Sequence, residues 1–524
     1  MKLRLFLLAT ATVLAGCGRQ EPCPRCDTLV IAAVGEPDHL LPPFAWQSVG
    51  RDIGDLVFER LAVLDPGQSP LDTGAYQPGL ASRWEQVDSI TWRFHLRSGA
   101  RWHDGTPVRA GDVEFSFAAY QDSTIDAPGR SSLASLHAAA EDDSTARITF
   151  PSPDPAQLYD ATWHVRVIPR HLWDSIPRDQ WGSRNQPERL IGSGHYRVAE
   201  WRRGDRLALE AVDDSPAIRR ILWTFAQAPD ALLTLALSGQ ADLIEALPDR
   251  ASRQAATGAS HLQLIDYPSA VYGFLGFNLA RPGAWSDVRV RRSLRLALDR
   301  ETLARSVIGS GAQVPGGPLS AQLWLWETPP PANGDTAQAR DLLDAAGWRL
   351  GRNGHRRRGN RELTVDILVP ATSAMRRDLA VALQERWSRL GVQATVTAVD
   401  FPVFQERLGQ GRFDTFIGSW LDEPHPRSLA EQWTRQGHGV LNYGRYANPV
   451  FDSLFTAAMA SADTGRTRAL WREAMDTLEQ DAPAIWLFTP VNTAAAHRRL
   501  RLTAFRPFAW LHDLPEWRLD PPAP

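Results

Sequence analysis

Residues 102–113 of this 524-residue chain are Trp102-His103-Asp104-Gly105-Thr106-Pro107-Val108-Arg109-Ala110-Gly111-Asp112-Val113. Its Asp-Gly and Thr-Pro pairs predict a turn in which Gly105 takes a positive φ angle, which costs glycine little. A helix is predicted to follow, with Asp112 as its N-cap or first-turn acid. The stretch therefore predicts a structural turn that leads into a helix.

The residues before this turn alternate between apolar and polar side chains. Trp92, Phe94 and Leu96 would lie on one side, with arginine and histidine between them. A period of two is typical of a half-buried strand, so we expect strand structure over residues 84–96. An apolar run at residues 28–33, ended by a Gly/Pro turn, predicts an earlier strand. Strands and helices therefore mix along the chain, as in an α/β protein.

Length and composition limit the classes of function. A chain of 524 residues suggests roughly three domains or subdomains. A formal net charge of −3 gives no electrostatic case for a nucleic-acid partner. The sequence contains no Gly-x-Ser-x-Gly or His-Glu-x-x-His motif, and its 13 histidines are scattered. We therefore expect no enzyme, no cofactor and no metal site.

Further runs fit the turn at residues 102–113 into one joint pattern. They lie at residues 77–85, 92–97, 192–198, 277–279, 287–294, 297–300 and 339–348. In this order the runs resemble the family 5 extracellular solute-binding proteins of ABC transporters, the peptide and nickel binders. The resemblance extends over residues 29–490, nearly the whole chain after its N-terminal segment.

The resemblance implies a fold and a division into lobes. The expected fold is the α/β periplasmic-binding-protein fold, in which two lobes close over a cleft and the chain crosses between them twice. Lobe I would comprise residues 27–266, with an additional subdomain at 61–185. Lobe II would comprise residues 267–483, and residues 484–524 would return to lobe I. The second crossing is expected near residues 481–485.

One loop, residues 416–426, carries the binding prediction. Peptide-binding members of the family have Trp-x-Ala-Asp-Tyr-Pro-Asp-Pro here, and the first aspartate meets the ammonium group of the ligand. This chain matches the pattern with one residue deleted. Trp420 aligns with the tryptophan and Asp422 with that aspartate, while Glu423 and His425 replace the tyrosine and the second aspartate.

The deletion leaves open whether Asp422 or Glu423 faces the ligand. A carboxylate that receives an ammonium group in a dry cleft forms a strong, charge-assisted hydrogen bond. The alternative is that one of these acids pairs with an arginine or caps a helix beginning near residues 427–429.

Aromatic and amide side chains are further candidates for the ligand site. Trp46, Trp420 and Tyr272 offer flat, amphipathic surfaces. Tyr272 and Phe274 lie on a strand-like run that ends at Asn278, and in the family this strand borders the ligand. The resemblance therefore adds Tyr272, Phe274 and Asn278 to the predicted site, where backbone hydrogen bonds to an extended peptide are expected.

The N-terminal 17 residues predict export. Two basic residues, Lys2 and Arg4, precede an apolar run that is too short to cross about 30 Å of hydrocarbon. The run ends in Leu14-Ala15-Gly16-Cys17, which resembles the lipoprotein processing box, where the cysteine is acylated. An ordinary signal peptide is the alternative. Gly18 after the cysteine favours the outer membrane, so we expect a periplasmic, membrane-anchored lipoprotein with residues 18–26 as its tether.

Two further cysteines, Cys23 and Cys26, are separated by only two residues. This spacing allows a small disulfide loop in an oxidising compartment. Free or metal-binding thiols and a redox pair are the alternatives.

The leading hypothesis is a lipid-anchored, monomeric receptor. It would trap a short peptide by hinge closure and deliver it to the permease subunits of an ABC transporter. The alternatives are a redox protein that uses Cys23 and Cys26, a sensor or chaperone for exported chains, and a binder of nickel or a metal complex on the same fold.

Overall fold

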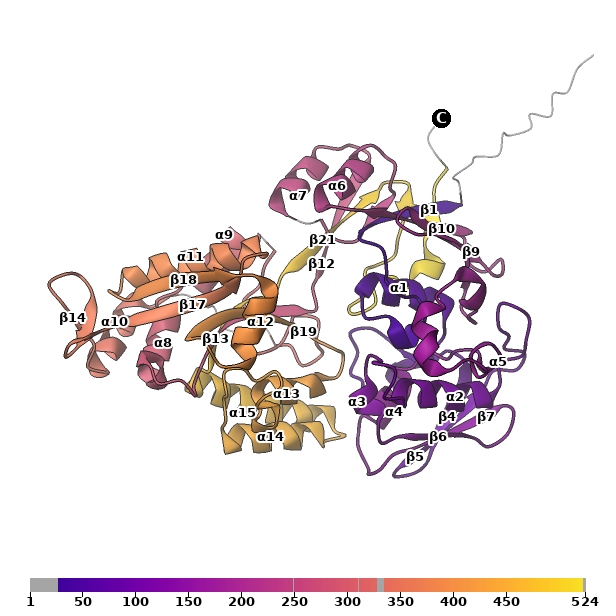
Figure 1. The fold of residues 1–524 in the computed structure, drawn as a ribbon, viewed down its shortest axis with the longest axis horizontal. Helices are drawn as coiled ribbons and strands as arrows, with labels where there is room; N and C mark the ends of the chain where they lie inside the picture. Colours follow the sequence, from indigo (N-terminus) through magenta and orange to yellow (C-terminus); the bar gives the residue numbers. More distant parts are fainter. Residues whose placement is uncertain (1–26, 248, 310, 328–333, 522–524) are drawn as a thin grey trace, which may run out of the picture.

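The computed structural model describes residues 27–247, 249–309, 311–327 and 334–521. These residues form two lobes that lie side by side and are joined by short crossings (Figure 1). The expected two-lobe α/β fold is therefore confirmed. The predicted signal segment, the tether and the cysteines Cys17, Cys23 and Cys26 lie outside the described residues.

Lobe I is built on a seven-stranded mixed sheet. In spatial order its strands are β12 (Leu262–Pro268), β21 (Val491–His497), β11 (Leu243–Ile244), β1 (Thr28–Val34), β10 (Arg220–Ala226), β9 (Arg206–Ala211) and β8 (Tyr196–Arg202). The central strand β1 runs parallel to both of its neighbours. Its side chains are buried on both faces, because Leu29 and Ile31 enter the main core while Val30 and Ala32 pack under α6 (Pro229–Leu237) and α7 (Arg250–Thr257).

The helices of this lobe are divided between this sheet and the rest of the lobe. They are α1 (Ser48–Val57), α2 (Ala110–Gln121), α3 (Arg130–Leu133), α4 (Gln157–Thr162), α5 (Arg170–Trp173), α6 (Pro229–Leu237) and α7 (Arg250–Thr257). Of these, α1, α6 and α7 are those that contact the strands of the sheet. Two small ladders complete the lobe, β2 (Ala62–Leu64) with β3 (Tyr76–Pro78) and β22 (Leu500–Arg501) with β23 (Arg518–Leu519).

A separate four-stranded sheet lies within residues 61–185. Its order is β4 (Ala81–Asp88), β5 (Thr91–Leu96), β7 (Thr145–Thr149) and β6 (His137–Ala140). The alternating stretch 84–96 is a hairpin of β4 and β5 and not a single strand. Trp92, Phe94 and Leu96 are all buried, as the alternation predicts.

The turn at residues 102–113 forms as predicted. Gly105 has a φ angle of 87°, and α2 begins at Ala110. Asp112 lies in the first turn, where its Oδ2 accepts a 2.8 Å hydrogen bond from the N–H of Arg109. Its Oδ1 accepts a 2.9 Å bond from the N–H of Arg170, so one buried carboxylate connects α2 to α5.

Lobe II is built on a five-stranded sheet. In spatial order its strands are β18 (Gln393–Val399), β17 (Thr364–Pro370), β19 (Thr415–Leu421), β13 (Val271–Phe277) and β20 (Ala484–Phe488). A small ladder of β14 (Arg349–Leu350), β15 (Arg356–Arg358) and β16 (Arg361–Glu362) lies apart from it. The helices of the lobe are α8 (Val288–Leu296), α9 (Arg300–Val307), α10 (Thr336–Ala345), α11 (Ala374–Ser388), α12 (Phe401–Gly409), α13 (Leu429–Trp433), α14 (Pro449–Met459) and α15 (Thr464–Asp481). Among the described residues, no helix combines the length and the hydrophobicity that crossing a bilayer requires.

Both crossings between the lobes are two residues long. Ser269 and Ala270 connect β12 to β13, and Thr489 and Pro490 connect β20 to β21. The N–H of Ser269 donates a 3.0 Å hydrogen bond to the carbonyl of Pro490, so the crossings lie side by side. The second crossing was expected near residues 481–485. It lies further along the chain because β20 pairs with β13 in lobe II before the chain leaves that lobe.

Candidate functional site

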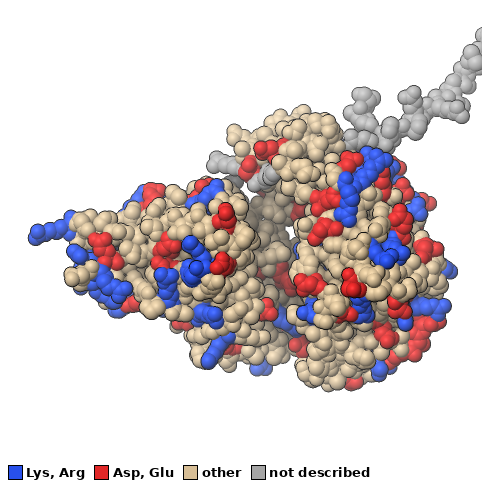
Figure 2. All heavy atoms as spheres, in the orientation of Figure 1, with Lys and Arg blue, Asp and Glu red and all other residues tan. Residues whose placement is uncertain are grey.

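A groove runs between the two lobes (Figure 2). Strand β19 ends at Leu421, and Asp422 follows it directly. The N–H of Asp422 donates a 2.7 Å hydrogen bond to the carbonyl of Ala270, which belongs to the first crossing. The predicted ligand carboxylate therefore lies beside the first crossing, where the two lobes are joined.

Asp422 is held in a defined position. Its side chain is buried, and its Oδ2 accepts a 2.5 Å hydrogen bond from the backbone N–H of Ser320. Within the described parts of the chain it forms no ion pair, and Ser320 is the residue that donates hydrogen bonds to its carboxylate. Burial raises its pKa to about 7, with Ser320 hydrogen bonds lowering the pKa and the nearby Glu423 raising it. The alternative that Asp422 pairs with an arginine does not hold in this structure.

Glu423 is half-buried and faces lobe I. Burial raises its pKa, and the guanidinium of Arg51 on α1 opposes that rise. Among the described residues, the Glu423 side chain forms no hydrogen bond or ion pair. Within this part of the chain neither of the two adjacent acids has a paired cation, and Arg51 is the cation that acts on Glu423 from the opposite lobe.

Trp420 precedes the acids on β19 and is half-buried. Its ring stacks on Tyr443, with ring centroids 6.1 Å apart and an interplanar angle of 25°. The geometry leaves Trp420 a candidate for ligand contact.

Three predicted ligand residues belong to the core of lobe II. Tyr272 is fully buried, donates a 2.5 Å hydrogen bond to Gln432 and accepts a 2.9 Å bond from the indole N–H of Trp433. Phe274, 1% exposed, lies among the rings of a buried aromatic cluster. Both side chains are buried in the core of lobe II, and their contact with a ligand stays a prediction. They are buried because β13 lies between two other strands and is covered on both faces.

Asn278 is the third of these residues. Its amide donates hydrogen bonds of 2.9 Å and 3.0 Å to the carbonyls of Gly411 and Phe413, and its own carbonyl accepts one from Trp285. Both amide hydrogens are thereby used, so Asn278 fixes the entry to β19 and does not reach the groove.

His425 lies where the lobes touch. Its ring centroid is 5.6 Å from that of Tyr159 in lobe I, and both side chains are buried. Burial lowers the pKa of His425 to about 3, and the charge of Arg427 acts in the same direction. His425 is therefore a neutral packing residue between the lobes and not a charged ligand group.

Trp46 is half exposed in lobe I, just before α1. Its indole N–H donates a 2.7 Å hydrogen bond to the carbonyl of Asp126, which fixes the direction of the ring. Its contact with a ligand stays a prediction.

Sequence reasoning missed Ser320 and Ala270, which position Asp422. Both act through backbone groups, so no side-chain pattern could have indicated them. Arg51 was also missed, because nothing in its local sequence relates it to Glu423, which lies hundreds of residues later.

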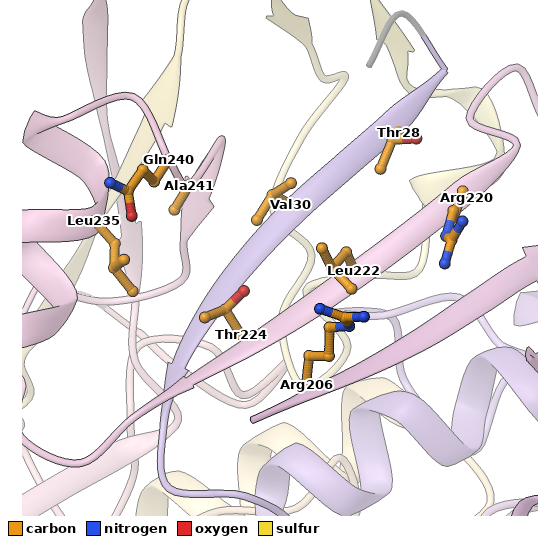
Figure 3. Close-up of a pocket in the computed structure, with 9 residues that line it drawn as sticks. All are labelled: Thr28, Val30, Arg206, Arg220, Leu222, Thr224, Leu235, Gln240 and Ala241. Atoms are coloured by element: carbon orange, nitrogen blue, oxygen red, sulfur yellow. The ribbon is translucent and has the colours of Figure 1, made fainter. Parts of the chain in front are cut away.

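A hollow of about 460 Å³ opens elsewhere, on the sheet face of lobe I. Figure 3 shows the side chains of Arg206 and Arg220 beside Leu222 on neighbouring strands. It contains none of the predicted ligand residues, so the interlobe groove is the better candidate. Over the described ranges, no group of three or more His, Cys, Asp or Glu side chains is arranged to hold a metal ion.

Comparison with known proteins finds relatives among the oligopeptide-binding proteins. The oligopeptide-binding protein OppA of Salmonella typhimurium is 25% identical over 482 residues, covering 85% of this chain and 83% of OppA. The oligopeptide-binding protein AppA of Bacillus subtilis is 22% identical, covering 94% and 91%.

Solved structures show the same fold. AppA of Bacillus subtilis in complex with a nonapeptide superposes with a TM-score of 0.73 at 20% identity, covering 94% of this chain and 99% of AppA. NikZ of Campylobacter jejuni in complex with Ni(L-His) gives a TM-score of 0.75 at 22% identity, with the same coverage.

The family model for bacterial extracellular solute-binding proteins, family 5, matches residues 75–439, which is more than half of the chain. Members of this family bind solutes outside the cytoplasm for transport, and they are not enzymes. With its two lobes, its paired crossings and its groove, the chain belongs to the family 5 extracellular solute-binding proteins of ABC transporters.

Proposed function

We propose that this chain is the lipid-anchored substrate-binding component of an ABC importer, which captures a short peptide and delivers it unchanged to a permease. The observation that carries the proposal is the buried carboxylate of Asp422 beside the first crossing, fixed by Ser320 and without an ion pair among the described residues. Relatives named as oligopeptide-binding proteins support peptide as the ligand class.

Hinge closure is the proposed mechanism. The lobes are joined by only two short crossings, at residues 269–270 and 489–490. A rotation about these residues would change the width of the groove while each lobe stays rigid. A ligand that contacts both walls stabilises the closed state by its higher affinity for that state.

The peptide ammonium group is proposed to bind Asp422. A charge-assisted hydrogen bond of this kind contributes about 1.5–3 kcal/mol, which corresponds to about 10- to 150-fold in Kd. Isothermal titration calorimetry with trialanine should therefore show that loss for Asp422→Asn. N-acetyl-trialanine, which has no ammonium group, should bind the wild-type protein as weakly. Equal affinity of the two proteins for trialanine would remove Asp422 from this role.

Glu423→Gln is the matched variant, because it neutralises the neighbouring acid. We expect a smaller loss of trialanine affinity, since no hydrogen bond or ion pair within the described residues holds the Glu423 side chain in one position. The opposite order of the two losses would assign the ammonium group to Glu423.

The lipid anchor is proposed from the Leu14-Ala15-Gly16-Cys17 sequence. Replacing Cys17 by serine should move the protein from the membrane fraction to the soluble fraction after cell disruption. Retention in the membrane fraction would contradict acylation at this residue. The measurement is independent of ligand binding.

A further inference from the structure

The lobes are also connected by a contact at the far end of the groove. Arg427 of lobe II extends to lobe I, where its Nη1 lies 2.6 Å from Asp160 and its Nη2 lies 3.1 Å from Asp154. Figure 1 places α4, which carries Asp160, across the groove from α13 and away from β12 and β21. The groove is thus bounded by covalent crossings at one end and by an ion pair at the other.

The Asp160 carboxylate of this ion pair is buried, and Arg427 is the cation that offsets the cost of its burial. The Asp160 side chain is only 6% exposed, while the Arg427 side chain is 37% exposed. Burial raises the pKa of Asp160 to about 7, and the guanidinium of Arg427 is the largest influence that lowers it. Removing this cation from a partly desolvated carboxylate would cost free energy. The ion pair therefore favours the state in which the two lobes are in contact.

Aromatic packing accompanies the ion pair. His425 packs on Tyr159, one residue before Asp160, and both rings are buried. The lowered pKa of His425 keeps its ring neutral beside Arg427, so the histidine adds no repulsion to the contact. His164, which also lies near Arg427, is neutral for the same reason of burial.

The contact is directly connected to the proposed ligand residues. Only residues 423–426 separate Asp422 from Arg427, and two of them, Pro424 and Pro426, restrict the backbone. An Arg427 side chain held on lobe I therefore also restricts where the carboxylates of Asp422 and Glu423 lie relative to lobe I.

We propose that Arg427, Asp160 and Asp154 form an interlobe lock that holds the groove closed, and that Arg427 is a positioning residue for the segment 422–426. The lock acts without a ligand, and only its consequence for peptide capture rests on the proposed function. It raises the closed fraction of the empty protein, and it must break before a bound solute can leave.

The test is small-angle X-ray scattering of the ligand-free mature protein. Arg427→Met should increase the radius of gyration, and Asp160→Asn should increase it less, because Asp154 remains to pair with Arg427. The double variant should match Arg427→Met, since that change already removes both ion pairs. The exchanged pair, Arg427→Asp with Asp160→Arg, should restore the compact profile. In addition, hydrogen exchange of the α4 amides should become faster in Arg427→Met.

Arg472→Met is the control, since Arg472 pairs with Glu327 at 2.7 Å within lobe II and should leave the profile unchanged. Identical profiles of wild type and Arg427→Met would overturn the lock. Equal opening of the control would overturn it as well. These profiles are recorded without peptide, so a failure of peptide binding at Asp422 would leave them unchanged, and the two hypotheses fail separately.

Discussion

The backbone N–H of Ser320 donates a 2.5 Å hydrogen bond to Oδ2 of Asp422, although 102 residues separate the two in the chain. This bond holds one oxygen of the carboxylate in place. A backbone donor cannot leave or rotate as a side chain can. Asp422 is therefore presented in one orientation before a ligand arrives, which reduces the entropy that binding costs.

The raised pKa of Asp422 predicts pH-dependent binding. With a pKa of about 7, the carboxyl group is mostly protonated at pH 5.5 and mostly ionised at pH 8. Only the ionised form pairs with an ammonium group, so trialanine affinity should rise about tenfold per pH unit below pH 7. Above about pH 8 the α-amino group loses its own proton, and the affinity should fall again.

Calorimetry in two buffers with different ionisation enthalpies checks this prediction, because binding near pH 6 should release close to one proton. Asp422→Asn is the control and should lose the rise between pH 5.5 and 7. A constant Kd of the wild-type protein over this range would contradict the assignment.

Asn278→Ala should lower the stability of the fold and leave peptide binding unchanged. The substitution leaves the buried carbonyls of Gly411 and Phe413 without their donors. The expected loss in the free energy of unfolding is about 1–3 kcal/mol. Urea denaturation measures the loss, and trialanine titration measures the affinity. A large loss of affinity with unchanged stability would return Asn278 to the ligand site.

Sequence patterns predicted well where a single segment decides the structure. The alternation of Trp92, Phe94 and Leu96 gave their burial, and the Asp-Gly pair gave the positive φ angle of Gly105. Asp112 was placed correctly in a first turn, because acids stabilise a helix N-terminus through local contacts.

The rest depends on contacts between distant segments. Tyr272 and Phe274 lie on a strand whose neighbours β19 and β20 cover it, and nothing in that strand alone shows that both of its faces are buried. The pair of Arg427 and Asp160 spans 267 residues of sequence. Local patterns contain no information about such pairs, so the position of Asp422 could be predicted while its surroundings could not.

The double replacement of Cys23 and Cys26 by serine separates binding from redox chemistry. We expect an unchanged trialanine affinity, because the proposed site is built from lobe residues around Asp422 and uses no thiol. The second measurement is thiol–disulfide exchange with a reduced and an oxidised test peptide. We expect no such activity in the wild-type protein or in the double variant. Loss of such an activity in the variant would instead support the redox alternative.

The turn at residues 102–113 is held by a distant partner in the sequence, Gly192. The N–H of Gly192 donates a 3.2 Å hydrogen bond to Nδ1 of His103, and the carbonyl of Gly192 accepts a 2.8 Å bond from the N–H of His103. The N–H of Gly194 donates to the carbonyl of Val57, the last residue of α1. Two glycines thus bring the turn and the end of α1 together.

Gly192→Ala should therefore destabilise lobe I. A Cβ atom at residue 192 would lie 1.8 Å from the carbonyl oxygen of Val57, a distance that only a backbone shift can relieve. Shifts of this kind cost about 1–3 kcal/mol, which urea denaturation can measure. Gly409→Ala is the control, because a Cβ there meets no atom within 4 Å and alanine favours the end of α12. Equal stability of the two variants would show that α1 can move away from residue 192 without cost.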